Sequence, residues 1–141
     1  MDDTFGFDEL KAELIVDEGQ RLQAYVDTVG LVTIGIGREL SRKGISEAEC
    51  DLLFSNDVEA CAAVMDEHIS WWRTLPQGAQ RVMINLCFMG WGSFSQFHHF
   101  LEAMRTHDWD RAVAELQDSR WWEQVKSRGP RVVERLRASV G

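Results

Sequence analysis

The sequence lacks any apolar run approaching the roughly 18 residues that a membrane-spanning helix requires. Residues 1–5 are acidic and polar, without the basic segment and the apolar segment of a secretory signal. We therefore expect neither a membrane span nor a leader. If the substrate lies outside the cytoplasm, another factor has to release the protein.

The sequence is also poor in cysteine, with only Cys50, Cys61 and Cys87. Cys50 and Cys61 fall on one predicted helix, about 16 Å apart at 1.5 Å per residue, which is too far for a disulfide. We expect all three cysteines to be reduced. No cysteine or histidine cluster has metal-ligand spacing, so we predict neither a metal nor another cofactor.

Basic residues are fewer than acidic ones, and the net charge is −8 over 141 residues. Acids predominate strongly in the first half of the chain, whereas bases predominate in the second. An acidic chain is a poor partner for nucleic acid. One group of cations could still contact an anionic surface, although a solvated helix face explains it equally well: Arg120, Lys126, Arg128, Arg131, Arg135 and Arg137.

The stretch from Glu18 to Arg38 carries most of the chemical information. Apolar residues at helical spacing precede Gly19, and glycine just beyond a helix end is a common cap, so the helix is predicted to end at Glu18. The C-terminal end of a helix dipole disfavours a negative charge. A carboxyl group there favours its protonated form, which is the form that a general acid needs.

The following residues predict a β-hairpin. β-branched and aromatic residues on both sides of Gly30 favour two strands with a turn between them. A turn centred on Gly30 places Asp27 opposite Thr33, with Cβ atoms roughly 5 Å apart. The alternation of strand side chains then places Thr33, Gly35 and Gly37 on one face, where bare backbone would form a floor for a bulky ligand.

This stretch contains the pattern E-G-x-R-L-x-x-Y-x-D-T-x-G-x-x-T-I-G-I-G. The pattern resembles that of the phage-type lysozymes, glycoside hydrolase family 24. The spacing of Glu18, Asp27 and Thr33 carries the resemblance, which extends from about Phe7 to about Ala138. It implies hydrolysis of the β-1,4 bond between N-acetylmuramic acid and N-acetylglucosamine in peptidoglycan, with inversion.

The resemblance also implies residue roles. Glu18 would be the general acid, Asp27 the base that activates water, and Thr33 the hydroxyl that holds this water. Further substrate-binding residues are expected at four positions: Gly35, Asn85, Phe88 and Arg128. For Asn85 and Phe88 a core role is comparably plausible. Arg38 stands where the family commonly has histidine, and we predict that it pairs with Asp57.

We predict an α+β fold, mostly helical, with the lysozyme-like division into a small β-hairpin lobe and a larger helical lobe joined by a long helix. One lysozyme domain covers residues 1–141, with the small lobe at about 12–58 and the helical lobe at about 59–141 plus the N-terminal helix. Ser46 and Glu49 fit a capping box for the long helix, which should end near His68. Further helices are expected at 77–89, from Ser93 or Ser95 to 105, at 108–116, after Ser119, and from Gly129-Pro130 to 138.

The function expected from this resemblance is that of an endolysin muramidase for host cell lysis. The protein would be made in the host bacterial cytoplasm and would reach the cell wall after holin-type release. Its partners would be the glycan strands of peptidoglycan, and we expect a monomer. The alternative is a catalytically inactive or tail-associated wall-binding homologue.

Overall fold

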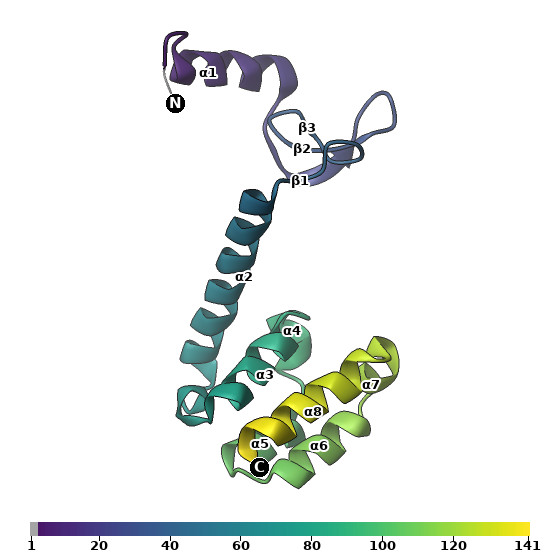
Figure 1. Cartoon of the computed structure of the whole chain (residues 1–141). Coiled ribbons are helices and arrows are strands. Elements are labelled where there is room, and N and C mark those ends of the chain that lie inside the picture. The colour runs from purple at the N-terminus through teal and green to yellow at the C-terminus, as the bar shows by residue number, and fades with distance from the viewer. Residues whose placement is uncertain (1–2) are drawn as a thin grey trace. The chain divides into compact units, whose positions relative to one another are not determined.

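The structure of the chain is a computed structural model that describes residues 3–141 (Figure 1). It contains two compact units, Met1–Asp51 and Leu52–Gly141. The N-terminal helix belongs to the first of these units. The predicted division into lobes near residue 58, with the N-terminal helix in the helical lobe, stays a prediction. No helix in the described part of the chain is both long enough and apolar enough to cross a membrane.

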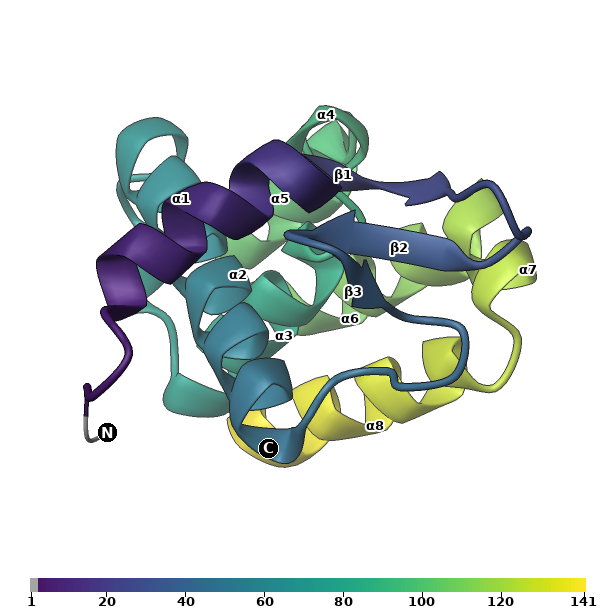
Figure 2. The ribbon, with the colours of Figure 1, turned by 90° about the horizontal axis from the view of Figure 1, so that it is seen from above.

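The first unit consists of a helix and a small antiparallel sheet. Helix α1 spans Phe7–Glu18 and therefore ends where glycine capping predicted. Three strands follow in the order β1 (Arg21–Val26), β2 (Val32–Gly35) and β3 (Arg38–Glu39) (Figure 2). Strand β3 was not predicted, and it turns the expected hairpin into a three-stranded sheet.

The register of the sheet differs from the predicted one. Thr33 pairs with Tyr25 on β1 and with Glu39 on β3, so it does not lie opposite Asp27. The connection between β1 and β2 runs from Asp27 to Leu31, whose backbone groups bond to each other at 2.9 Å. The turn is thus centred one residue earlier than Gly30, and Asp27 is a diagonal neighbour of Thr33 on the same face.

The predicted floor of glycines is also only partly formed. Gly35 ends β2 with a φ of +68°, and Gly37 lies in the tight turn to β3 with a φ of +67°. The strand alternation that would place Gly37 below Thr33 therefore stops at Gly35. Instead, Gly37 allows the chain to reverse into β3 with a positive φ, which residues other than glycine rarely adopt.

Helix α2, Glu47–His68, begins in the first unit and continues into the second. Its capping box is confirmed, since the Ser46 N–H donates to Glu49 Oε1 at 2.8 Å and the Glu49 N–H donates to Ser46 Oγ at 3.1 Å. Arg38 also binds Glu49, at 2.8 and 2.9 Å. The partner of Arg38 within the first unit is therefore the capping carboxylate of Glu49, and the pairing of Arg38 with Asp57 of the second unit stays a prediction.

The second unit is helical. After α2 it contains η1 (Trp72–Thr74), α3 (Gln77–Cys87), α4 (Trp91–Phe94), α5 (His98–Arg105), α6 (Trp109–Gln117), α7 (Arg120–Val125) and α8 (Arg128–Val140). Asp108 and Ser119 cap α6 and α7 through their side chains, as predicted. The serine cap predicted for α5 is wrong, since α5 begins after Phe97. Gly129 and Pro130 lie inside the first turn of α8, where proline is tolerated.

The hydrophobic core lies in the second unit. Its largest fully buried side chains are Phe94, Phe100, Met65, Met83, Leu86, Met104, Leu116 and Leu136. Helix α8 packs against both α3 and α6 (Figure 1). Because these contacts bury most of the apolar faces of α3 and α8, the two helices form a fixed pair that can hold polar side chains along its edge.

Candidate active site

Glu18 is the last residue of α1, and two glycines determine its surroundings. Gly19 ends the helix with a φ of +79°, and its N–H donates to the Ile15 carbonyl at 2.8 Å. A Cβ atom placed on Gly37 would lie 3.0 Å from Glu18 Oε2 and 3.2 Å from its Cδ. The exposed carboxyl group of Glu18 therefore lies against the β2–β3 turn, at a point where only a glycine leaves space for it.

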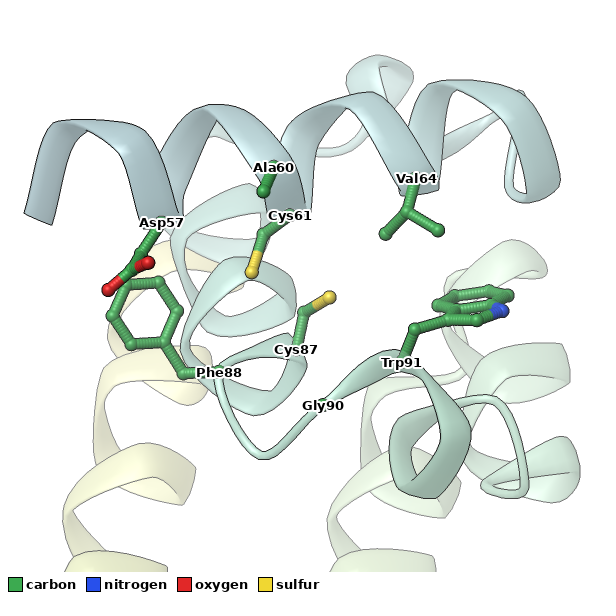
Figure 3. A pocket seen from close by; sticks show the side chains of 8 residues that line it. All are labelled: Asp57, Ala60, Cys61, Val64, Cys87, Phe88, Gly90 and Trp91. Atoms are coloured by element: carbon green, nitrogen blue, oxygen red, sulfur yellow. The ribbon is translucent and has the colours of Figure 1, made fainter. Parts of the chain in front are cut away.

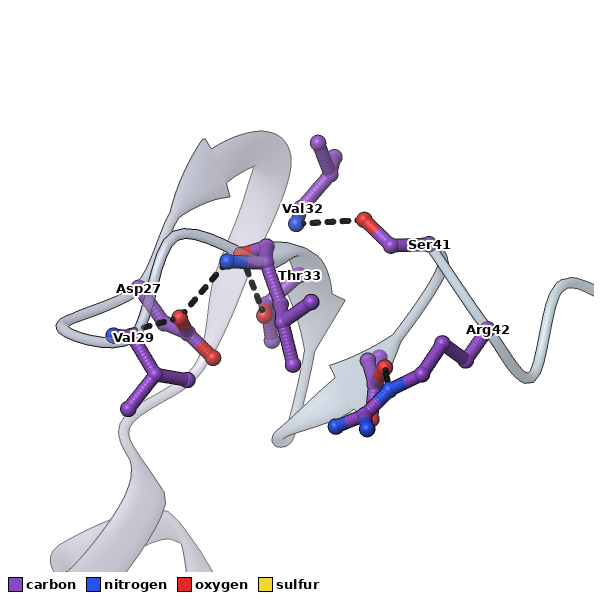
Figure 4. Close-up of polar contacts among 8 residues, drawn as sticks. Asp27, Val29, Val32, Thr33, Ser41 and Arg42 are labelled. Carbon is purple, nitrogen blue, oxygen red and sulfur yellow. Dashed lines mark hydrogen bonds and ion pairs between the residues drawn. The ribbon is translucent and has the colours of Figure 1, made fainter.

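Asp27 is half-buried and forms the β1–β2 turn with its own side chain. Its Oδ1 accepts the backbone N–H groups of Val29 at 3.0 Å and Leu31 at 2.9 Å (Figure 4). Aspartate commonly forms this type of turn. Its second oxygen, Oδ2, accepts no hydrogen bond within residues 3–141, so it is available to a water molecule or a ligand.

Thr33 is buried, with a relative exposure of 5%. Its hydroxyl donates to the carbonyl of Leu31 at 3.3 Å. Leu31 therefore binds both functional groups, since its N–H reaches Asp27 and its carbonyl reaches Thr33. Because the Thr33 proton is used in this way, the lone pairs of its oxygen remain free to accept a hydrogen bond.

Two further charged residues adjoin this pair, and the sequence did not indicate them. Glu39 lies beside Thr33 on β3, and Arg42 binds Glu39 at 2.6 Å (Figure 4). The hydrogen bond and the charge of Glu39 raise the pKa of Arg42, and the charge of Asp27 acts in the same direction. A strand of two residues has no periodicity in its sequence. The position of Glu39, and of Arg42 bound to it, is therefore known only from the pairing of β3 with β2.

The other predicted binding residues lie in the second unit, apart from Gly35. Arg128 donates through Nη2 to Asn85 Oδ1 at 2.6 Å and to the Asn85 carbonyl at 2.9 Å. Both residues line a groove of about 600 Å³, together with Phe88. The structure thus brings Asn85, Phe88 and Arg128 to one groove, where Phe88 is 43% exposed and therefore not a core residue.

Asp57 lies at a second cavity of this unit, of about 420 Å³, on its α2 side. Cys61 and Cys87 face each other across this cavity, with Phe88 and Trp91 nearby (Figure 3). Burial raises the pKa of the Cys87 thiol to about 12, and its hydrogen bond with Cys61 adds to this. A thiol with so high a pKa is a poor nucleophile, which is consistent with the small apolar role expected for these cysteines.

The sequence matches the family described as phage lysozyme over residues 16–138. The chain belongs to the phage lysozyme family. This match includes Glu18, Asp27 and Thr33 and continues through Arg128. The phage lysozymes are glycoside hydrolases, so membership of this family places the chain among enzymes that cleave glycosidic bonds.

The individual relatives are of two kinds, a phage spike protein and lysozymes of about the same length as the chain. The chain is 29% identical to the pre-baseplate central spike protein Gp5 of Enterobacteria phage T4, over 82% of the chain but only 25% of that protein. It is 26% and 25% identical to the probable T4-type lysozymes 2 and 1 of Dictyostelium discoideum, over 88% of the chain and 91% of each relative. The chain therefore spans about a quarter of the spike protein and nearly all of the two lysozymes.

Proposed function

We propose that the chain is a muramidase that hydrolyses the β-1,4 bond between N-acetylmuramic acid and N-acetylglucosamine in peptidoglycan. Membership of the phage lysozyme family supports glycoside hydrolysis. The observation that carries the proposal is the arrangement around Leu31. Asp27 and Thr33 both bind Leu31 there, and each keeps an oxygen that can accept a further hydrogen bond, which is the pair of acceptors that a nucleophilic water needs.

The proposed mechanism assigns one role to each side chain. Glu18, in its protonated form, donates a proton to the glycosidic oxygen as the bond to the sugar carbon breaks. A water molecule attacks this carbon from the opposite face. Asp27 Oδ2 accepts one proton of the water, and Thr33 Oγ1 accepts a hydrogen bond from the other. This leaves the water oxygen directed at the sugar.

The length of β2 supports inversion of configuration. Glu18 is held at the Gly37 end of the strand, and Asp27 is held at the other end. Four residues of strand span roughly 10 Å between their ends. Inverting glycosidases place their carboxyl groups about 6.5–9.5 Å apart to accommodate a water molecule, whereas retaining ones place them at about 5–5.5 Å. Because Glu18 and Asp27 are held at points this far apart, the inverting class is favoured.

The groove of the second unit is proposed to bind the glycan. The exposed ring of Phe88 offers an apolar surface of the kind on which sugar rings pack. Asn85 and Arg128 provide hydrogen-bonding groups that are fixed by their mutual bonds. In the first unit, Gly35 would allow a sugar to approach the backbone closely, because a Cβ atom there would contact nothing within 4 Å.

The test is clearing of chloroform-treated Gram-negative cells by the purified chain and three variants. Glu18→Gln and Asp27→Asn should each lower the rate by about 10²–10⁴-fold, the usual contribution of general acid–base catalysis. Glu13→Gln is the matched control, since Glu13 is an exposed glutamate on the same helix as Glu18. Equal clearing by Glu18→Gln and the parent would remove Glu18 from the mechanism. The configuration of the new reducing end, followed by NMR, tests inversion.

We further propose that the protein is made in the host bacterial cytoplasm and lyses the host after release to the wall. A second candidate, favoured by the similarity to the phage T4 spike protein, is a lysozyme domain carried by the phage tail. Mass spectrometry of purified phage particles and of the lysate separates the two. Recovery with the particles at constant stoichiometry supports the tail context, and recovery only in the lysate supports the endolysin.

A further inference from the structure

A small cavity lies between α3 and α8 in the second unit. Its volume is about 320 Å³. Its lining consists of Gly78, Arg81, Val82 and Asn85 from α3, and Val132 and Arg135 from α8. Two arginines therefore enter one cavity from two packed helices, and no acidic residue is part of the lining.

The packing of the two helices fixes this cavity. Gly78 of α3 lies against Ser139 of α8, and a Cβ atom on Gly78 would clash with the Ser139 side chain. The same position lies 3.5 Å from Arg81 Nη2, so the guanidinium group of Arg81 is held beside the seam. The floor is formed by Val82 and Val132, both buried.

The side chains of this cavity have free hydrogen-bond donors, whereas their one acceptor is already used within the protein. Arg128 uses Nε and Nη2 to bind the side-chain oxygen of Asn85. The acceptor of Asn85 is thereby occupied, and its amide N–H₂ remains. The two guanidinium groups of Arg81 and Arg135 can only donate. A ligand that satisfies these groups has to be an acceptor, and a negative charge strengthens each of the bonds.

Three other arginines of the second unit bind a carboxylate of the same unit: Arg73 at 2.7 Å, Arg105 at 2.5 Å and Arg137 at 3.1 Å. The remaining arginines of this unit have no such partner within it, and among them only Arg81 and Arg135 line this cavity. Within Leu52–Gly141, neither Arg81 nor Arg135 has a carboxylate within ion-pair distance. In a chain with a net charge of −8, two cations that share a cavity without an internal partner repel each other, and a bound anion would remove this repulsion.

We propose that Arg81 and Arg135 form an oxyanion site that binds a carboxylate of the peptide part of peptidoglycan. The proposal rests on the proposed function, which supplies this substrate. The site shares Arg81 and Asn85 with the groove that contains Phe88 and Arg128. Since peptides branch from the glycan strand, a glycan in that groove would place a peptide carboxylate within reach of the two arginines. Continuity of the two grooves favours this source over a free phosphate.

The test compares two double variants of the full chain. Arg81→Gln/Arg135→Gln removes both charges from the site, and Arg105→Gln/Arg111→Gln removes the same charge from α5 and α6; all four arginines are exposed. Each protein is titrated by calorimetry with a soluble disaccharide–peptide that has free carboxylates, and with the same fragment after amidation. Sodium phosphate is titrated separately.

We expect the site variant to bind the free-carboxylate fragment about tenfold or more weakly than the parent, since charge-assisted hydrogen bonds are lost. The control variant should stay within about twofold, and the amidated fragment should bind all three proteins equally weakly. Without ligand, the site variant should melt no lower than the parent, because a repulsion has been relieved. Equal affinity of the parent and the site variant, or a site that takes phosphate but not the fragment, would overturn the proposal.

These results are independent of the catalytic assignment. If Glu18→Gln clears cells as the parent does, the proposed chemistry fails, while the binding measurements still decide the oxyanion site. If the site variant binds and hydrolyses normally, the oxyanion site fails and the muramidase proposal is unaffected.

Discussion

Replacing Gly37 by alanine tests whether the β2–β3 turn positions the carboxyl group of Glu18, the proposed general acid. The new Cβ would lie 3.0 Å from Glu18 Oε2 and 3.2 Å from its Cδ and Cγ, where ordinary contacts are 3.4–4 Å. The Glu18 carboxyl has to move by a few tenths of an ångström, whereas a misplacement of about 1 Å can cost about 10²-fold in rate. We therefore expect kcat/KM to fall by less than this, by about 3- to 10-fold.

The same substitution also strains the backbone, and Gly44→Ala is the control for this effect. Gly44 has a φ of +62°, close to the +67° of Gly37, but a Cβ atom there meets nothing within 4 Å. Both variants should lose about 1–2 kcal/mol from the positive φ of an alanine. Only Gly37→Ala should lose activity beyond what its reduced stability explains.

The assay is hydrolysis of soluble glycan–peptide fragments, measured well below the unfolding temperature of each variant. Unfolding of the first unit can be followed by NMR of Tyr25, the single tyrosine of the chain, which lies on β1. All six tryptophans belong to the second unit and report on it separately. If the two glycine variants have the same kcat/KM, the contact between Gly37 and Glu18 does not position the acid.

Three further predictions follow from single contacts. Asp27→Asn should keep the turn, because an amide oxygen still accepts both backbone N–H groups, but should lose activity; circular dichroism and clearing assays check this. Hydrogen bonds with Arg38 and Ser46 lower the pKa of Glu49 from 4.5 to about 2 in the folded state. The stabilisation by ionised Glu49 is therefore complete above pH 4.5 and disappears toward pH 2. The urea midpoint of Glu49→Gln should vary less over this pH range than that of the parent. Gly129→Ala would place a Cβ 2.7 Å from the Trp122 ring and should destabilise by about 1–3 kcal/mol, unlike Gly92→Ala, in thermal melts.

Sequence reasoning succeeded where the signal was local. The end of α1 at Glu18 depended on the adjacent Gly19. The starts of α2, α6 and α7 depended on side chains that bond three residues away, at Ser46, Asp108 and Ser119. Such contacts involve short spacings along one helix turn. They are present in the sequence as patterns, so their geometry can be predicted without knowledge of the tertiary structure.

Sequence reasoning failed where partners come from different elements. The sequence did not indicate that Arg38 binds the capping glutamate Glu49, through Nη1 and Nη2. Glu39 and Arg42 were missed, because a two-residue strand carries no alternation and acquires its position only by pairing with β2. The cavity of Arg81 and Arg135 required two helices to meet, and no spacing along the chain indicates which arginines will share a cavity.

The error in the hairpin register shows how folding and chemistry depend on the same carboxylate. We placed the turn at Gly30 because glycine is the strongest turn signal, and treated Asp27 as a strand residue that was free to act. In the structure Asp27 makes the turn itself through Oδ1, and the turn is centred one residue earlier, which places Thr33 diagonally to Asp27. Two hydrogen bonds thereby hold the Asp27 side chain, while its Oδ2 accepts none within residues 3–141. The carboxylate that forms the turn is the one proposed as the base, so the proposed base needs no separate support.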